Sequence, residues 1–323
     1  MEAAIITTYR CTNKCYMCNI WRHPTTKEDE FRPDLLDKLP RLAFANITGG
    51  EPFLREDIEE IVTIVLRKAR RVVISTNGFL TDRIVDTAKK FRDKKLGIRV
   101  SLEGLPAAND ELRGTKDCFD HGLRTLLELR RLGFKDIGFG ITVSDRNAGD
   151  LIELYELAKS MGVEFATAAV HNSYYFHKFD NTIEKTDEVV SAFREIARDL
   201  LATKRIKNWF RAFFNYGLMN YVGGKPRLLP CAAGTDMFFL DPSGEIYPCN
   251  GLEETAWFAG MGNLHRQTFE EIWNGERAEE VREKVRNCPK NCWMIGTVAP
   301  VMKKRLWKPA AWIIAHKFLK RPL

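Results

Sequence analysis

The chain lacks any apolar run long enough to cross a lipid bilayer. Its longest wholly apolar stretch near either end, residues 310–315, is far shorter than the roughly 20 residues of a membrane-spanning helix. The first ten residues also lack a signal-peptide pattern. With 22 Gly and 13 Pro among 323 residues, the composition excludes collagen and argues against general disorder. We therefore expect a folded cytoplasmic protein.

Acidic side chains are absent from residues 301–323, which contain seven of the Lys and Arg residues. The rest of the chain carries basic and acidic residues in equal number, so this tail accounts for the net charge of +7. A nucleic-acid-binding protein needs a basic face on its folded body, and we expect no nucleic-acid partner. Apolar residues such as Trp307, Trp312 and Phe318 alternate with the basic ones, which predicts peripheral membrane contact. A solvated extension is the alternative.

Eight cysteines in a cytoplasmic enzyme more often bind metal or catalyse than form disulfides. Their spacing separates a compact group near the start from a dispersed group in the last third, and Cys118 stands alone as an expected small buried residue. The two groups are Cys11, Cys15 and Cys18, and then Cys231, Cys249, Cys288 and Cys292.

Short β-rich runs alternate with helical patterns along the first half of the chain. This alternation is typical of βαβ units and predicts an α/β fold whose parallel strands form a wound sheet or an incomplete barrel. The predicted strands are 3–8, 44–48, 71–75, 97–102, 137–143 and 164–170, and the predicted helices are 33–39, 55–69, 81–93, 119–132 and 148–161.

The pattern changes in the second half of the chain. A longer amphipathic helix is expected over 185–203, followed by a boundary near 205–230. Two short β runs, 237–240 and 245–247, flank the turn Asp241-Pro-Ser-Gly244 and predict a hairpin.

Polar and glycine-rich groups follow the first four predicted strands. Because the carboxyl ends of parallel strands carry the active site in α/β folds, we expect these groups to meet on one rim. Three thiolates cannot complete a four-ligand zinc site, but they can hold three irons of a [4Fe–4S] cube and leave the fourth open. A zinc knuckle completed by His23 is the alternative. The groups are the first three cysteines, Gly49-Gly50-Glu51-Pro52, Thr76-Asn77-Gly78 and Ser101-Leu-Glu103-Gly104.

The segment Tyr9-Arg-Cys-Thr-Asn-Lys-Cys-Tyr-Met-Cys18 resembles the cluster loop of radical S-adenosylmethionine (SAM) enzymes. Met17 occupies a position that is more often aromatic and that meets the adenine largely through its backbone in this family. Gly49, Gly50 and Glu51 resemble the family's GGEP motif, which binds the SAM amino group. A strand-to-helix turn alone would also explain these glycines.

The resemblance extends to further residues at the rim. Ser101 and Glu103 match family positions near the SAM carboxylate and ribose, although either could simply end a strand. Arg113 resembles the Arg of a family Arg-Gly pair that follows this strand; its guanidinium could pair with a carboxylate, and a surface ion pair is the alternative. Asn77 is assigned to the SAM site as well, and an ordinary Asn-Gly turn competes with that role. No catalytic residue can be assigned.

A second resemblance covers the last third. Cys231-x12-Gly244-x4-Cys249 resembles the opening of SPASM or twitch domains, which bind auxiliary iron–sulfur clusters. Four thiolates are enough for one auxiliary [4Fe–4S] cluster, as in the twitch version, and a four-thiolate zinc site is the alternative. The expected organisation is a partial (β/α)6 radical SAM barrel at 1–180, linker helices at 181–230, a small α+β auxiliary-cluster domain at 231–296 and a basic amphipathic tail at 297–323.

The resemblance implies an enzyme that uses a [4Fe–4S] cluster and SAM to generate a 5′-deoxyadenosyl radical, with flavodoxin or ferredoxin as reductant. Because the first strand starts close to Met1, we expect no leader-binding domain ahead of it. The basic tail favours a small-molecule substrate of lipid-linked or carbohydrate type. Two alternatives are a peptide-modifying enzyme with a separate leader-binding partner and a non-catalytic metal-binding module. Residues 171–177, rich in His and Tyr, would face the substrate or pack on the following helix.

Overall fold

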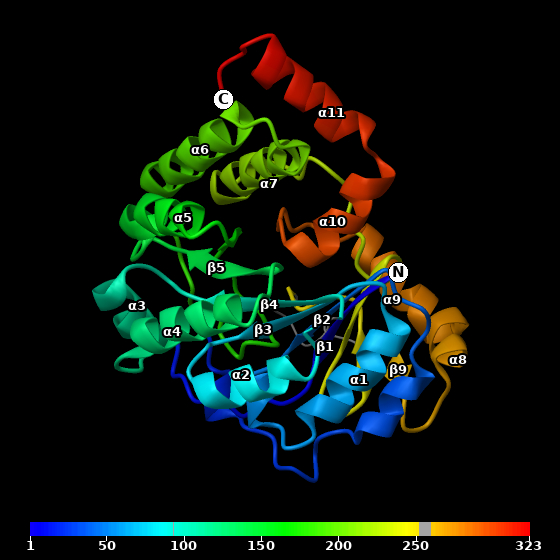
Figure 1. Ribbon diagram of the computed structural model, residues 1–323. Helices are drawn as coiled ribbons and strands as arrows, with labels where there is room; N and C mark the ends of the chain where they lie inside the picture. The colour runs from blue at the N-terminus through cyan, green and yellow to red at the C-terminus, as the bar shows by residue number, and fades with distance from the viewer. Residues whose placement is uncertain (93, 252–259) are drawn as a thin grey trace.

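The computed structural model describes residues 1–92, 94–251 and 260–323 (Figure 1). Within these residues one sheet has the strand order β6-β5-β4-β3-β2-β1-β7-β8-β9. Strands β1 to β6 are parallel to one another, β7 pairs in parallel with β1, and β8 and β9 continue the sheet antiparallel. The predicted α/β class with a parallel sheet is confirmed. The strands are β1 Glu2–Ile6, β2 Phe44–Thr48, β3 Val72–Thr76, β4 Leu96–Ser101, β5 Ile137–Val143, β6 Glu164–Ala169, β7 Met237–Leu240, β8 Glu245–Tyr247 and β9 Gly262–Asn263.

Helices connect the parallel strands and then extend beyond the sheet. Figure 1 shows α5, α6, α7 and α11 following one another away from the sheet, and neighbours in this series are in contact. Short 3₁₀ turns at Ile20–Arg22, Pro33–Lys38, Pro52–Leu54 and Ala148–Asp150 complete the connections. The α-helices are α1 Ile58–Lys68, α2 Thr81–Lys89, α3 Pro106–Arg113, α4 Cys118–Arg131, α5 Leu151–Ser160, α6 Thr186–Ala202, α7 Ile206–Val222, α8 Phe269–Asn274, α9 Glu276–Arg286, α10 Ile295–Lys304 and α11 Trp307–Ile313.

Helix α3 was not predicted, and α7 fills most of the interval where a boundary was expected. Helix α3 is short and polar, begins at Pro106 and ends at Gly114, whose φ of 57° is left-handed. Helix α7 buries residues around most of its circumference, so its sequence has no clear amphipathic period. The segment 33–39, predicted as a helix, is a 3₁₀ helix that begins at Pro33.

One hydrophobic core crosses the predicted domain limits. Phe139 of β5, Phe193 of α6, Leu218 of α7, Phe238 of β7 and Val298 of α10 all belong to it. Strand β1 lies between β2 and β7, so the strand that leads to the first cysteines is held by both halves of the chain. The predicted hairpin is therefore present as β7 and β8, but it extends the main sheet.

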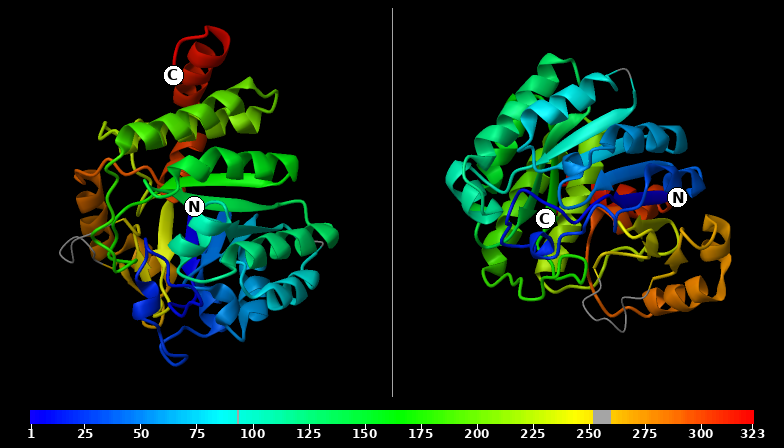
Figure 2. Two further views of the ribbon diagram at one scale, coloured as in Figure 1. Left: turned by 90° about the vertical axis from the view of Figure 1, so that its left-hand side faces the viewer. Right: turned by 90° about the horizontal axis from the view of Figure 1, so that it is seen from below.

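The predicted basic tail is helical and packs on the body. Lys303 and Lys304 of α10 form ion pairs with Glu2 and Asp236, each at 2.5 Å. Helix α11 lies against α7, and the Trp312 ring is 5.5 Å from that of Phe213. A π-helical turn, Ile314–Phe318, follows it. The left view of Figure 2 shows the red C-terminal helical segment standing above the green helices. In the described ranges, every helix is too short or too polar to span a bilayer.

Two glycines of β5 allow a direct test of the sheet. A Cβ atom at Gly138 would lie 1.9 Å from the Glu164 carbonyl oxygen of β6, whereas one at Gly140 would meet nothing within 4 Å. We expect Gly138→Ala to lower the free energy of unfolding by about 3 kcal/mol through overpacking, and Gly140→Ala to change it by less than about 1 kcal/mol. Urea denaturation measures both, and equal stabilities would contradict this β5–β6 register.

Candidate functional site

The cysteine-bearing loop, residues 9–19, leaves the carboxyl end of β1 and is held against the end of α3. The Lys14 N–H donates to the Arg113 carbonyl at 3.0 Å, and the Tyr16 N–H donates to that of Leu112 at 2.8 Å. A Cβ atom at Gly114 would lie 2.4 Å from the Lys14 carbonyl oxygen. Glycine is thus required there by its left-handed φ and by the close approach of this loop.

The turn after β2 packs on the start of the same loop. The Gly50 N–H donates to the Thr8 carbonyl at 2.7 Å, and the Glu51 N–H donates to that of Arg10 at 2.8 Å. Cβ atoms at Gly49 and Gly50 would lie 2.6 Å and 2.2 Å from those two carbonyl oxygens. The two glycines therefore let two backbones meet.

Glu51 is fully buried and joins the ends of β2 and β3. Its carboxylate accepts hydrogen bonds from the Asn77 N–H at 2.7 Å, the Thr76 hydroxyl at 2.8 Å and the Phe53 N–H at 3.1 Å. Burial raises the pKa of Glu51 above its ordinary value of 4.5, and these hydrogen bonds oppose the rise. The contacts fix the turn that holds Asn77.

Asn77 reaches the cysteine-bearing loop with its side chain. Its amide donates to the Thr12 hydroxyl at 2.8 Å and lies 3.9 Å from the Cys11 sulfur, while its side-chain oxygen accepts from the Phe79 N–H at 2.9 Å. Asn77 forms a turn through its bond with Phe79 and also contacts the cysteine-bearing loop through Thr12. Its position is therefore compatible both with an ordinary Asn-Gly turn and with a place in the SAM site.

Glu103 and Arg113 form a buried pair beside the cysteines. Arg113 donates to the Glu103 carboxylate at 3.1 Å, and that carboxylate also accepts from the Thr142 N–H at 2.7 Å. Side-chain exposures of 8% and 4% exclude the surface ion pair considered for Arg113. The guanidinium interacts electrostatically with Cys15, and its buried Nε has no hydrogen-bond partner. An unpaired buried donor of this kind suits an anionic group. Ser101 ends β4 on the same rim.

Met17 is buried with Leu112 and Val170, and its carbonyl accepts a hydrogen bond from the Asn181 amide at 3.1 Å. Sequence reasoning missed Asn181, which lies in a loop without periodicity. Residues 171–178 pack on the cysteine-bearing loop, since the Asn19 N–H donates to the Phe176 carbonyl at 2.8 Å. Tyr175 reaches the Gly49 carbonyl with its hydroxyl at 3.4 Å. This contact joins the end of β6 to the turn after β2.

The first three cysteines are free thiols in one environment. Burial raises the pKa of Cys15 to about 12 and that of Cys18 to about 11, and the neighbouring cysteines contribute to both shifts. Binding a metal cluster would remove these protons. Cys118 is fully buried, as expected, and its sulfur accepts from the Asn13 amide at 2.8 Å.

The other four cysteines line one cavity of about 470 Å³. Burial raises the pKa of Cys249 to about 12 and that of Cys292 to about 11. The guanidinium of Arg227 lies 3.5 Å from the Cys292 sulfur, and basic residues line much of the remaining wall. Cys18 and Cys249 each pack against the small apolar cluster that includes Ile6 and Phe239.

The donor sets of both groups fit iron–sulfur clusters. Thiolates are the ligands of such clusters, and three and four of them are brought together here. Among the residues that the structure describes, no three His, Cys, Asp or Glu side chains are arranged to hold a metal ion. The fit therefore rests on the chemistry of the donors and on the cavity that four of them share.

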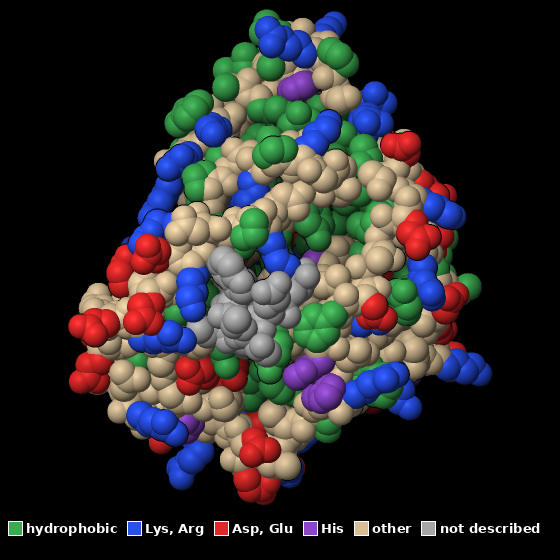
Figure 3. Space-filling model, turned by 180° about the vertical axis from the view of Figure 1, so that it is seen from behind, with side chains coloured by type: hydrophobic (Ala, Val, Ile, Leu, Met, Phe, Trp, Pro, Cys, Tyr) green, Lys and Arg blue, Asp and Glu red, His purple; other side chains and the backbone are tan. Residues whose placement is uncertain are grey.

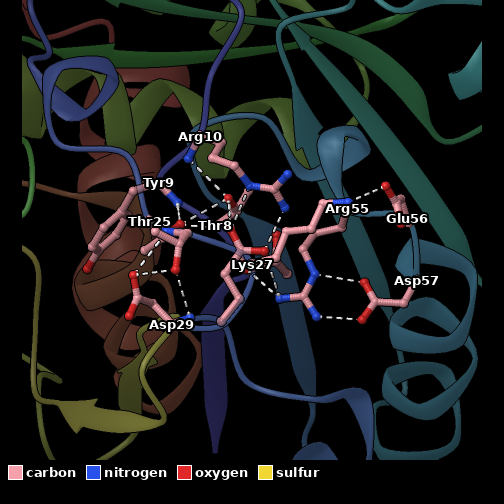
Figure 4. Close-up of polar contacts among 12 residues, drawn as sticks. Thr8, Tyr9, Arg10, Thr25, Lys27, Asp29, Arg55, Glu56 and Asp57 are labelled. Atoms are coloured by element: carbon pink, nitrogen blue, oxygen red, sulfur yellow. Dashed lines mark hydrogen bonds and ion pairs between the residues drawn. The ribbon is translucent and has the colours of Figure 1, made fainter.

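A buried polar network that the sequence did not reveal supports the start of the cysteine-bearing loop (Figure 4). Glu30 accepts hydrogen bonds from the Arg10 guanidinium at 2.9 and 2.6 Å, from the Thr25 hydroxyl at 2.7 Å and from the Thr8 hydroxyl. Arg55 lies 3.5 Å from the same carboxylate and donates to the Thr7 carbonyl at 2.9 Å. Arg10 and Arg55 lie far from Glu30 in the sequence, so no local sequence pattern predicts this network.

Two family models match the chain. The radical SAM superfamily model matches residues 5–158, and the SPASM model, an iron–sulfur cluster-binding domain, matches residues 231–294. The first runs from the end of β1 through β5 and into α5, and the second contains the last four cysteines.

Curated relatives include two proteins from microbes. The Fe-coproporphyrin III synthase of Methanosarcina barkeri is 35% identical over 157 residues, which are 46% of this chain and 39% of that protein. The mycofactocin maturase MftC of Mycolicibacterium smegmatis is 28% identical over 85% of this chain and 71% of its own length. This chain thus spans less than half of the first relative.

Among solved structures, native anSMEcpe with bound AdoMet and Kp18Cys peptide has a similar fold. The TM-score is 0.66 at 15% identity, and the match covers 97% of this chain and 98% of the other. At this level of identity the likeness concerns the fold, which includes the docked C-terminal helices of this chain.

We expect Glu30→Gln to lower the free energy of unfolding by about 3 kcal/mol, because it leaves Arg10 and Arg55 without their shared buried carboxylate. Urea denaturation of the metal-free protein at pH 7 is the measurement. Glu28→Gln, at an exposed neighbouring site, is the control and should change stability by less than about 0.5 kcal/mol.

The pH dependence gives a second readout of the same change. Burial disfavours the charged form of Glu30, but hydrogen bonds from Arg10, Thr8 and Thr25 outweigh it and lower its pKa below the ordinary 4.5. The contribution of this carboxylate is thus present above pH 4.5 and is lost as the pH falls through the lowered value. The difference between wild type and Glu30→Gln should narrow over that range, and a constant difference would contradict the assignment.

Proposed function

Because this chain is a radical SAM enzyme with a C-terminal SPASM iron–sulfur domain, we propose that it cleaves SAM reductively and abstracts hydrogen from a small-molecule substrate. Arg113 is the observation that carries this proposal most directly. It is a buried cation with an unpaired donor beside the cluster thiols, at a place where a bound carboxylate would complete its hydrogen bonding.

Cys11, Cys15 and Cys18 would hold the SAM-binding [4Fe–4S] cluster, and three ligands leave one iron open. Cys231, Cys249, Cys288 and Cys292 would hold one auxiliary [4Fe–4S] cluster, supported by the cavity that they share. Arg227 would place a positive charge against this second cluster through its contact with Cys292.

When bound at Cys11, Cys15 and Cys18, a [4Fe–4S] cluster would supply the one-electron chemistry for reductive cleavage of SAM to methionine and a 5′-deoxyadenosyl radical. The protein's part is to bind, orient and enclose. Arg113 would hold the SAM carboxylate, and Glu103 keeps that guanidinium in place. Glu51 positions Asn77 and the turn near the SAM amino group, and the backbones of Met17, Gly49 and Gly50 shape the rest of the site. Ser101 would contribute from the end of β4.

A small-molecule substrate is supported by the relative that is named for Fe-coproporphyrin III. Gly140 of β5 faces open space, which leaves room on the sheet for such a molecule. Among small molecules, we favour a lipid-linked or carbohydrate-type compound as the substrate. The C-terminal helices expose apolar and basic side chains together, which suits contact with a membrane where such a compound would be found. The reductant would be a flavodoxin or a ferredoxin.

A peptide substrate is the second candidate. It is favoured by the similar fold of anSMEcpe, whose structure contains a peptide together with AdoMet. In that case a separate partner protein would bring the leader segment of the peptide. Deuterated candidates of both classes distinguish the two, because label passes to 5′-deoxyadenosine only from the true substrate.

Reductive cleavage of SAM is the central test. Anaerobically reconstituted protein with dithionite should release 5′-deoxyadenosine, and Cys15→Ala should reduce this release at least about 1000-fold because the cluster loses a ligand. Cys118→Ser is the control and should retain activity, because Cys118 is not one of the proposed ligands and serine keeps a hydrogen-bond acceptor for Asn13. Turnover by Cys15→Ala, or zinc without iron in the purified protein, would refute the proposal.

The auxiliary cluster can be tested separately. Wild type should bind about eight irons per chain and Cys249→Ala about four, with 5′-deoxyadenosine release retained, since only one of the two sites changes. Iron analysis and electron paramagnetic resonance measure the loss. An unchanged iron content would show that Cys249 is not a ligand.

A further inference from the structure

Large exposed apolar side chains gather at one end of the molecule. Six of them, each 51–66% exposed, come from the C-terminal helices and from the start of α7. The two segments are in contact, because Lys317 donates to the Thr203 carbonyl at 3.1 Å and the Phe318 ring lies 6.0 Å from that of Trp209. We call this the apex surface, and its residues are Ile206, Leu306, Trp307, Ile314, Phe318 and Leu319.

Basic residues surround the apex surface. Residues 301–323 contain no acidic side chain, and Lys204 and Arg205 join them from the turn before α7. In the described part of the chain, only Lys303 and Lys304 among the seven tail cations form ion pairs. Figure 3 shows this end, at the top of the view, covered by hydrophobic and basic side chains with no acidic one.

The apex surface is built on a packed scaffold. Ile313 is buried, and the Trp312 ring lies 5.1 Å from that of Tyr216 and 5.5 Å from that of Phe213 on α7. The exposed apolar side chains are thus the outer face of helices whose inner face is already used. Because this surface is already folded, binding does not require the conformational entropy loss of folding these helices.

The positive charge of the apex surface indicates which kind of partner it can bind. A second copy of the chain would present the same positive charges and be repelled. The helices are too short or too polar to span a bilayer in the described ranges, but apolar side chains flanked by cations are what an interfacial helix presents to anionic lipid.

We propose that the apex surface docks on an anionic lipid bilayer, with Trp307, Phe318 and Leu319 in the headgroup region and the surrounding cations on lipid phosphates. The docking itself is independent of radical chemistry. It would bring the enzyme to a lipid-linked substrate, and that consequence rests on the proposed function.

Full-length protein should be used for the test, since a truncation at Ala299 would remove the buried Val301, Met302 and Ile313. Co-sedimentation is measured with vesicles of phosphatidylcholine alone and of phosphatidylcholine with phosphatidylglycerol, at low and high salt. Wild type should bind the anionic vesicles, more weakly at high salt, and bind the neutral ones poorly.

Two double variants separate the charge from the apolar contribution. Lys320→Glu/Arg321→Glu should weaken binding at least roughly fivefold for each cation removed. Trp307→Ala/Phe318→Ala should weaken it roughly tenfold through lost apolar burial. The matched controls Lys135→Glu and Leu127→Ala change exposed residues near and on α4 and should bind as wild type does.

Each outcome has one meaning. Equal vesicle binding by wild type and apex variants, or no binding by any of them, would overturn the docking proposal. Self-association of the wild type in sedimentation velocity, abolished by Trp307→Ala/Phe318→Ala, would overturn it in favour of an interface between copies. 5′-Deoxyadenosine release, measured without vesicles on the same preparations, should be unchanged, so a failure of docking is distinguished from a failure of the radical chemistry.

Discussion

The close backbone contact between the turn after β2 and the cysteine-bearing loop sets the geometry of the whole site. Hydrogen bonds from Gly50 to Thr8 and from Glu51 to Arg10 form only because no Cβ atom stands between the two segments. Glu30 binds Arg10 of the same loop and Arg55, and Figure 4 shows these two arginines close to Thr8. The position of Cys11 therefore follows from main-chain packing.

The two buried carboxylates at the rim serve mainly to orient other groups. Glu51 accepts three hydrogen bonds from the protein, and Glu103 accepts from Arg113 and from the Thr142 backbone. Their charges are thus largely satisfied within the chain. What they leave available to a ligand is the unpaired donor of Arg113. Spectroscopic work on Glu51 variants should accordingly consider displaced neighbours as well as lost contacts.

The sequence predicted the features that repeat along the chain and missed those that depend on distant partners. All six parallel strands were placed within two residues, because buried β-rich runs alternate with amphipathic helices. The four groups on the rim were found because strand ends in a parallel sheet lie together. Asn181, the pairing of Glu30 with two arginines and the continuous sheet were missed, since each depends on contacts between segments far apart in sequence. The sequence also could not show that the tail cations would be divided between ion pairs and a free surface.

The pairing of β7 with β1 has a consequence for how the protein is made. Strand β1 is synthesised long before β7, and one of its two edges stays unpaired until residues 237–240 have been made. An open edge of buried apolar residues is a template for misassociation, so the nascent chain depends on late contacts of high sequence separation. Nonsense mutations anywhere upstream of β7 would leave this edge uncovered in the product, which makes such fragments candidates for proteolysis and aggregation.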